Sequence, residues 1–203
     1  LYATTENIHK MSEIRGDTMS NLHQAMKKEP EAFRDLIVLK DVQRIVVEIV
    51  NSILGSKETL INISTIKSAK NYIFQHSIDT TVLAIALANK LKFNRNELDE
   101  LAMGCLLHDL GMTLMPEKLI NKAGMLTAKE YALIKEHSVL GYKILSSNPN
   151  IFPIVSQVAC QHHERQDGSG YPFGFSGSNE KPEKAILYEK GRIFRNAEIA
   201  TVA

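Results

Sequence analysis

The chain has few cysteines, almost no net charge and no long apolar run. Its two cysteines, Cys105 and Cys160, lie within apolar stretches, so we exclude a disulfide framework and expect a reducing compartment. The formal net charge of +1 over 203 residues argues against a long nucleic acid as the main partner, because such a partner requires a clustered basic surface. A small nucleotide needs only a few well-placed cations and stays possible.

Apolar runs are also too short for a membrane span. The longest, residues 82–88, is far below the roughly 20 residues that cross a bilayer. No signal peptide is visible, and the sequence begins at Leu1 rather than at methionine. We therefore expect a cytoplasmic domain from a longer protein, in which a membrane anchor can lie upstream.

Helical signals are strong and strand signals weak throughout the sequence, so we predict an all-α fold. A wide apolar stripe predicts a helix over residues 37–54, with Gly55 as its stop. A second helix is expected over residues 65–91. We divide the chain into a helical lead-in, residues 1–62, which is a linker or the tail of a regulatory module, and a second domain, residues 63–203.

Two capping-box patterns predict further helix starts: Asn94 with Glu97, and Thr127 with Glu130. The first of these helices should reach Asp109, and Gly111 is placed to end it. The second should pass His137 towards Leu145. The first helix therefore carries His108 and Asp109 near its C-terminal end, and the second carries His137.

The last third of the sequence is punctuated by proline and glycine. Pro149 and Pro153 break the chain before a helix that leads to His162. A glycine-rich loop, residues 167–172, follows, and residues 186–203 are predicted to form a final helix.

Histidines are concentrated in the second domain. Of the 7 in the chain, five lie there at helix ends or on helix faces: His76, His108, His137, His162 and His163. Each taken singly is typical of an ordinary satisfied side chain, so spacing alone leaves a metal site and a set of structural histidines both open. Imidazole nitrogens with the carboxylate of Asp109 would suit iron, manganese, zinc or nickel. Two such ions polarise a phosphoryl oxygen and activate a bridging water for in-line attack on phosphorus.

Four motifs together resemble the HD-GYP family, a branch of the HD phosphohydrolase superfamily. They are His76-Ser77, His108-Asp109-Leu110-Gly111, Glu136-His137, and the run His162-His163-Glu164-Arg165-Gln166-Asp167-Gly168-Ser169-Gly170-Tyr171-Pro172. The resemblance covers residues 66–203, with the motifs in the order of the family. A lone His-Asp pair is a weak signal, whereas the long HHExxDGxGYP match is highly specific.

The resemblance implies an all-helical HD-type bundle around a centre of two or three divalent metal ions, most commonly iron or manganese. It also implies hydrolysis of the bacterial messenger cyclic di-GMP to linear pGpG or on to GMP. One ion would be held by His76, His108 and Asp109, and Asp109 would bridge to a second ion held by His137, His162 and His163. His108 and Asp109 would then be the catalytic pair.

By the same resemblance, the glycine-rich loop shapes the substrate pocket and can dock diguanylate cyclase domains. The expected substrate-binding residues are Arg165, Asp167, Gly168, Gly170, Tyr171 and Pro172. From the residues alone, Tyr171 either packs on a base or braces the loop, and Arg165 either pairs with a phosphate or stays solvated.

Three positions depart from the family pattern. Met112 stands where the motif often has a lysine that assists at the phosphate. We expect Met112 to be a packing residue, with either slower activity or substitution by Lys118, Lys122 or Arg165. Tyr72 stands where some members have a glutamate ligand for a third ion, which favours a two-metal site. A further aspartate ligand of the family would be expected immediately after Ala203.

Neighbouring carboxylates and thiols have simpler interpretations. We expect Glu164 and Asp167 to orient the imidazoles or the loop rather than bind metal, and Asp79 to lie on the helix surface. Cys105 and Cys160 are interpreted as small core residues.

Two alternative functions accompany the leading hypothesis, and the role of one helix is also open. The domain could hydrolyse another cyclic nucleotide, or it could be a receptor or docking module without turnover, which Met112 keeps open. The stripe on residues 37–54 could pair two chains in a homodimer or pack on the second domain.

Overall fold

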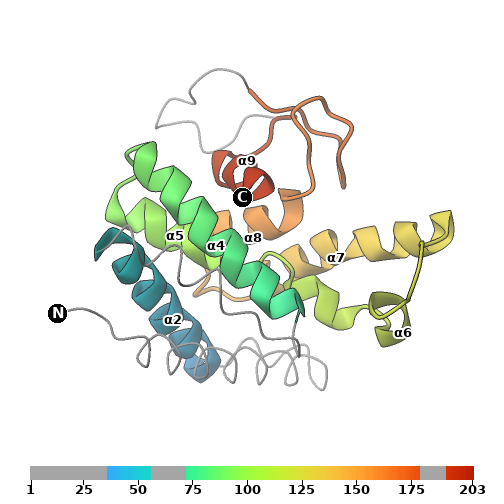
Figure 1. The fold of residues 1–203 in the computed structure, drawn as a ribbon, viewed down its shortest axis with the longest axis horizontal. Helices are drawn as coiled ribbons and strands as arrows, with labels where there is room; N and C mark the ends of the chain where they lie inside the picture. The colour runs from blue at the N-terminus through green and yellow to red at the C-terminus, as the bar shows by residue number, and fades with distance from the viewer. Residues whose placement is uncertain (1–35, 56–71, 179–190) are drawn as a thin grey trace.

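The computed structural model describes residues 36–55, 72–178 and 191–203. Eight helical elements lie in this part of the chain (Figure 1): α2 (Leu36–Gly55), α4 (Tyr72–Lys90), α5 (Arg95–Leu107), η2 (Leu110–Leu114), α6 (Glu117–Ile120), α7 (Ala128–Ser146), α8 (Pro153–Gln161) and α9 (Arg195–Val202). Within the described residues the only extended pairing is two isolated bridges, Asp167 with Ser176 and Ser176 with Arg192. The predicted all-α class is confirmed.

Helix α5 forms the centre of the bundle. Every residue from Leu101 to Leu107 is buried, and α5 contacts α2, α4, α8 and α9. A helical segment that is buried on all sides has apolar residues around its whole circumference rather than along one stripe. Residues 101–107 of α5 show this pattern. The element that ends in His108 is therefore held from several directions.

Helix α2 packs its apolar stripe against this core. Ile45, Ile49 and Val50 are almost fully buried, and α2 contacts both α4 and α5. Leu54, expected in the stripe, is instead 43% exposed. The side chains of Ile37 and Val38 lie outside the described set. Packing on the second domain, one of the two expected uses of the stripe, is thus observed, and a homodimer through these helices stays a prediction.

Local signals located the helix starts. Both capping boxes are present, Asn94 with Glu97 before α5 and Thr127 with Glu130 before α7. Pro153 occupies the first turn of α8, where its missing N–H costs nothing. The helix expected over residues 65–91 is observed from Tyr72 to Lys90, and residues 65–71 lie outside the described part.

Two boundary predictions were wrong. Helix α5 ends at Leu107, so Gly111 does not stop it but lies inside the short helix η2. A Cβ at Gly111 would collide with the backbone carbonyl of His137, which shows that glycine is needed for close approach to α7. The last helix begins only at Arg195, because residues 191–194 form a turn and a bridge, and residues 186–190 lie outside the described part.

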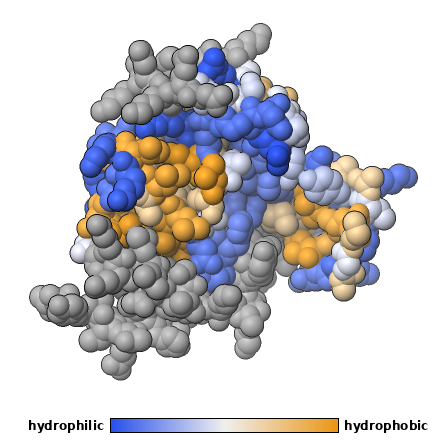
Figure 2. Space-filling view, turned by 45° about the horizontal axis from the view of Figure 1, so that its top comes forward, coloured by the Kyte–Doolittle hydropathy of each residue, from blue (hydrophilic) through white to orange (hydrophobic). Residues whose placement is uncertain are grey.

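Apolar side chains also reach the surface. Leu83 and Leu87 of α4 and Leu91 just after it are exposed, and Figure 2 shows apolar surface gathered in two areas of one face. Among the described helices, none combines the length and the apolar character needed to cross a membrane.

Candidate metal centre

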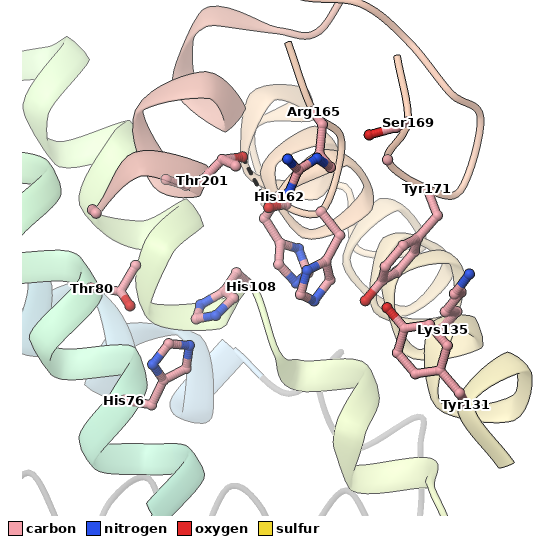
Figure 3. A pocket seen from close by; sticks show the side chains of 14 residues that line it. His76, Thr80, His108, Tyr131, Lys135, His162, Arg165, Ser169, Tyr171 and Thr201 are labelled. Atoms are coloured by element: carbon pink, nitrogen blue, oxygen red, sulfur yellow. Dashed lines mark hydrogen bonds between the residues drawn. The ribbon is translucent and has the colours of Figure 1, made fainter. Parts of the chain in front are cut away.

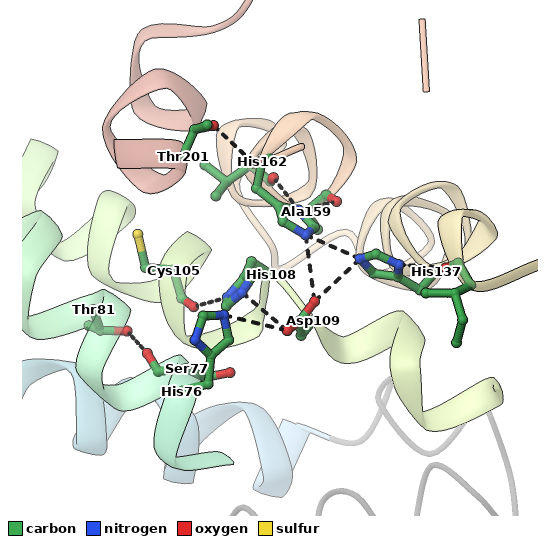
Figure 4. Close-up of polar contacts among 12 residues, drawn as sticks. His76, Ser77, Thr81, Cys105, His108, Asp109, His137, Ala159, His162 and Thr201 are labelled. Atoms are coloured by element: carbon green, nitrogen blue, oxygen red, sulfur yellow. Dashed lines mark hydrogen bonds and ion pairs between the residues drawn. The ribbon is translucent and has the colours of Figure 1, made fainter. Parts of the chain in front are cut away.

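The structure brings all six predicted ligand residues to one place, where four helices meet (Figure 4). His108 follows the last residue of α5 and His162 the last residue of α8. Their ligand atoms fall into two groups, each spanning no more than 4.8 Å: Asp109, His137, His162 and His163, and His76, His108 and Asp109. Asp109 is the one residue that both groups share.

The Asp109 carboxylate turns one oxygen to each group. Its Oδ1 lies 3.3 Å from Nε2 of His137 and 3.5 Å from Nε2 of His162. Its Oδ2 lies 3.3 Å from Nε2 of His108 and 3.9 Å from Nε2 of His76. A carboxylate with its two oxygens directed at separate sets of imidazoles has the geometry of a bridging ligand.

Three of the imidazoles are oriented by their own helices. Nδ1 of His108 lies 2.6 Å from the carbonyl oxygen of Cys105, and Nδ1 of His137 lies 2.7 Å from that of Ile134. His162 repeats the pattern, with Nδ1 2.9 Å from a carbonyl oxygen three residues earlier in α8. Each Nδ1 therefore carries the donated proton, which leaves the Nε2 lone pair for a ligand bond.

Converging lone pairs create a site that favours a cation. Nε2 of His137 and Nε2 of His162 are only 3.2 Å apart, and both face Asp109. Two imidazole nitrogens and a carboxylate oxygen this close together can all direct lone pairs at a single cation. The nitrogen and oxygen donor set fits a divalent transition metal ion, and the backbone carbonyls supply the outer contacts that such ligands have in metal sites.

The electrostatics of the cluster agree with this donor set. Burial lowers the pKa of His162 to about 4 and, together with the neighbouring imidazoles, lowers the pKa of His163 to about 2. Burial opposes the charge on Asp109, but His108 beside it holds the pKa of this carboxyl well below its usual range. Burial likewise opposes charge on His108, yet Asp109 raises the pKa of that imidazole.

The glycine-rich loop is tied down by a buried carboxylate. Glu164 is fully buried, and its two oxygens accept hydrogen bonds from the backbone N–H groups of Phe173 (2.8 Å) and Phe175 (3.0 Å). A Cβ at Gly170 would collide with backbone atoms of His163 and Arg165, so only glycine allows the loop to fold back this closely. Glu164 therefore orients the loop, as expected, and not the metal ligands.

Asp167 serves the loop as well. Its Oδ1 accepts hydrogen bonds from the backbone N–H (3.0 Å) and the hydroxyl (2.6 Å) of Ser169, and these contacts lower the pKa of the carboxyl. Gly168 follows with a φ of 75°, which glycine adopts without strain. Tyr171 stacks on His163, with ring centroids 4.6 Å apart and planes at 22°, so it braces a ligand histidine.

A cavity of about 360 Å³ opens beside the ligand cluster (Figure 3). Its lining includes four ligand histidines and residues of the loop and of α9: His76, His108, His162, His163, Arg165, Ser169, Gly170, Tyr171, Ala200, Thr201 and Ala203. Asp167, Gly168 and Pro172, predicted to bind substrate, do not line it. Thr80, Tyr131 and Lys135 do, and sequence reasoning did not single them out. The one available signal was the four-residue spacing of Tyr131 and Lys135, which places them on one face of α7.

Of the positions that depart from the family pattern, Met112 has a described side chain and Tyr72 does not. Met112 lies in η2 and does not line the cavity. Of the cations expected to replace a lysine there, Lys118 is exposed outside the cavity and Lys122 pairs with Glu130 at 2.6 Å. Only Arg165 lines it. The side chain of Tyr72 lies outside the described set, and a ligand after Ala203 stays a prediction.

The remaining side chains of interest are structural. Cys105 and Cys160 are buried, and burial raises their thiol pKa values to about 12 and about 11. A thiol held protonated in this way is a poor metal ligand, as the core interpretation expects. Asp79 accepts a hydrogen bond of 2.9 Å from Gln75 along α4.

Comparison with known proteins adds a family and several relatives. The family described as HD domain matches residues 58–187. The chain is 35% identical over 129 residues to cyclic di-GMP phosphodiesterase PA4108 of Pseudomonas aeruginosa, covering 64% of this chain and 31% of that one. It is 34% identical over 121 residues to cyclic di-GMP phosphodiesterase PdeB of Borreliella burgdorferi, covering 60% and 32%.

Two further comparisons bear on substrate and fold. A Vibrio cholerae relative, 34% identical over 131 residues (64% of this chain and 29% of that one), is named 3'3'-cGAMP-specific phosphodiesterase 1. The solved structure of Bd1817, a HDG"Y"P protein from Bdellovibrio bacteriovorus, superposes with a TM-score of 0.72 at 22% identity, covering 93% of this chain and 56% of that one. The chain thus spans about a third of the length of these curated relatives.

Proposed function

Since the chain belongs to the HD-domain family, we propose that it is a metal-dependent phosphodiesterase that hydrolyses cyclic di-GMP to pGpG or GMP. The observation that carries this proposal is the Asp109 carboxylate, whose two oxygens face two separate groups of histidine Nε2 atoms. The names of relatives about one third identical to the chain support cyclic di-GMP as substrate. The number of ions, two, and their identity, iron or manganese, belong to the same proposal.

The residues of the chain divide the work of such a reaction. Divalent ions held at the two groups would polarise a phosphoryl oxygen and lower the pKa of water beside it. Asp109 would fix the spacing between the groups, and His108 would offer its Nε2 to an ion. The buried rings of His137 and His162 exclude bulk water from one side, and the cavity admits the nucleotide from the other.

The direct test is turnover by the purified protein. Loaded anaerobically with ferrous iron or manganese, it should convert cyclic di-GMP to product that chromatography resolves, and removal of the metal by a chelator should abolish this. Product would also show that Met112 is tolerated. If fully loaded protein binds the nucleotide without product, the domain is a receptor or docking module, the alternative that Met112 keeps open.

A second substrate has its own supporting observation. The Vibrio cholerae relative named for 3'3'-cGAMP is as similar to this chain as those named for cyclic di-GMP. We therefore include 3'3'-cGAMP in the same turnover assay. A ratio of kcat/KM that favours 3'3'-cGAMP would replace cyclic di-GMP as the substrate and leave the reaction class unchanged.

We also propose where the domain works and what its loop binds. Two free, buried cysteines suit a reducing cytoplasm. On the loop, Phe173 is 58% exposed and stacks on Phe175 with centroids 5.0 Å apart, which offers an aromatic surface to a diguanylate cyclase domain. Phe173→Ser should abolish copurification of such a domain and leave turnover intact. Unchanged copurification would refute this docking site.

A further inference from the structure

The end of the cavity away from the ligand cluster carries a cation between two aromatic rings. Lys135 projects from α7, and its Nζ lies 4.6 Å from the ring centroid of Tyr131 and 5.2 Å from that of Tyr171. The two rings are nearly perpendicular, at 82°, with centroids 6.5 Å apart. Figure 3 shows the lysine beside both tyrosines, opposite His76 and His108.

The position of Lys135 is fixed without neutralising its charge. Ring faces attract an ammonium group through their quadrupoles but accept few of its three N–H groups, so donors stay available. Among the described residues, no carboxylate lies within ion-pair distance of Lys135. By contrast, Lys122, in the segment between α6 and α7, pairs with Glu130 at 2.6 Å. An oriented, unneutralised ammonium group that lines a cavity is suited to an anion.

Among the described residues, Arg165 is the one other lysine or arginine that lines the cavity, and it differs from Lys135 in both burial and charge pairing. The side chain of Arg165 is 66% exposed, and its Nε lies 3.7 Å from Asp167 Oδ1. Lys135 is partly buried and is connected to the ligand cluster through Tyr171, which stacks on His163. The wall of the cavity thus runs without interruption from a ligand histidine, through an aromatic ring, to a positive charge.

From this arrangement we propose that Lys135 binds the second, uncleaved phosphate of a cyclic dinucleotide, with Tyr131 and Tyr171 holding the ammonium group in place. The proposal rests on the phosphodiesterase function given above and adds a determinant of its substrate class. A cyclic dinucleotide carries two phosphodiesters, and when one lies at the ligand cluster the other needs a partner elsewhere in the cavity. A substrate with a single phosphodiester would not use Lys135.

The test separates binding from chemistry with three variants. Lys135→Met removes the charge but keeps a flexible apolar side chain over the rings, and Lys135→Arg keeps the charge. Lys143→Met is the matched control, because Lys143 is exposed on the same helix and does not line the cavity. Calorimetry gives the Kd for a phosphorothioate analogue of cyclic di-GMP that resists hydrolysis. Turnover of bis(p-nitrophenyl) phosphate, a single phosphodiester, reports on the ligand cluster alone.

Lys135→Met should weaken binding of the analogue about tenfold or more, the effect of one lost charge-assisted hydrogen bond. Lys135→Arg should recover most of this, and Lys143→Met should match wild type. All three should hydrolyse bis(p-nitrophenyl) phosphate at the wild-type rate. Unchanged binding in Lys135→Met, or an equal loss on both compounds, would overturn the proposal, because the lysine would then be unused or would support the ligand cluster itself.

The outcomes also distinguish this inference from the proposed function. If wild-type protein binds the analogue but hydrolyses nothing, the enzyme proposal fails, and the Kd values still decide the role of Lys135. If it hydrolyses cyclic di-GMP and Lys135→Met is unaffected in both Kd and KM, only the role of Lys135 fails. If it binds 3'3'-cGAMP instead, the same comparison applies to that dinucleotide. Binding of neither dinucleotide would refute both.

Discussion

The two groups of predicted ligands share Asp109 and each contains a buried histidine, but only the second contains an exposed one, His76. In the first, the side chains of His137 and His162 are 2% and 5% exposed, and each ring is held by a carbonyl of its own helix. In the second, the side chain of His76 is 46% exposed near the start of α4. If both groups hold an ion as proposed, burial would fix the ligands of the first in advance, whereas the second would keep one ligand, His76, open to solvent.

The largest effect is expected when the residue common to both groups is changed. Asp109→Asn keeps the shape of the side chain but removes the charge that faces four imidazoles. We expect loss of metal from both groups and a fall in kcat/KM of at least about 100-fold, or about 2.7 kcal/mol. Metal analysis by mass spectrometry and turnover measure this, with circular dichroism as the check on folding. Full metal content in Asp109→Asn would contradict a bridging role.

The next largest effect concerns the contact that brings the two groups together. Gly111→Ala would push a Cβ into the backbone carbonyl of His137, and neither η2 nor α7 can move away without displacing a ligand. We expect a loss of about 3 kcal/mol or more in the free energy of unfolding, measured by urea titration. Gly55→Ala is the control, since a Cβ there meets nothing within 4 Å. Equal stability of the two variants would show that the approach is not tight.

A paired substitution sharpens the contrast between buried and exposed ligands. His162→Ala should remove the ion of the buried group and most of the rise in Tm that manganese produces, because the stabilisation by an ion increases with the logarithm of its affinity for the folded state. His76→Ala should leave the buried ion bound and retain most of that rise. Thermal unfolding with and without manganese gives the comparison. Similar losses in both variants would mean that burial does not separate the two positions.

The smallest effect is expected at the loop. Glu164→Gln leaves an amide oxygen to accept from one of two backbone N–H groups, at a cost of about 1–3 kcal/mol confined to the loop. Amide hydrogen exchange at Phe173 and Phe175 should accelerate about tenfold or more, and KM should rise with metal content unchanged. If exchange at these amides keeps its wild-type rate, Glu164 does not secure the loop.

Sequence reasoning succeeded where the signal is local. The capping boxes at Asn94 and Thr127 and the proline of α8 mark helix starts through contacts within four residues, and these predictions are confirmed. The ligand set depended on motifs that keep their order along the chain, and the structure gathers all its members. Their roles as metal ligands stay predictions that the variants above test.

The sequence-based predictions failed where a residue makes its important contact with a segment that is distant in sequence. Gly111 looked like a helix stop because its true contact, the carbonyl of His137, is distant in sequence. Tyr131 and Lys135 were not identified because nothing in α7 alone shows that this face meets the loop bearing Tyr171. Met112 drew attention as a missing cation, while a lysine from another helix lines the cavity instead.

The bonds from ring nitrogen to backbone carbonyl have a consequence for how this architecture tolerates change. His108, His137 and His162 each take their orientation from a carbonyl three residues earlier in the same helix. None of these three contacts involves the segment between α6 and α7, so residues inserted there should not rotate a ligand, unlike insertions beside His108 or His162, which themselves follow a helix end. The segment between α6 and α7 can therefore be lengthened, or can accept a grafted peptide, while the centre keeps its donors aligned.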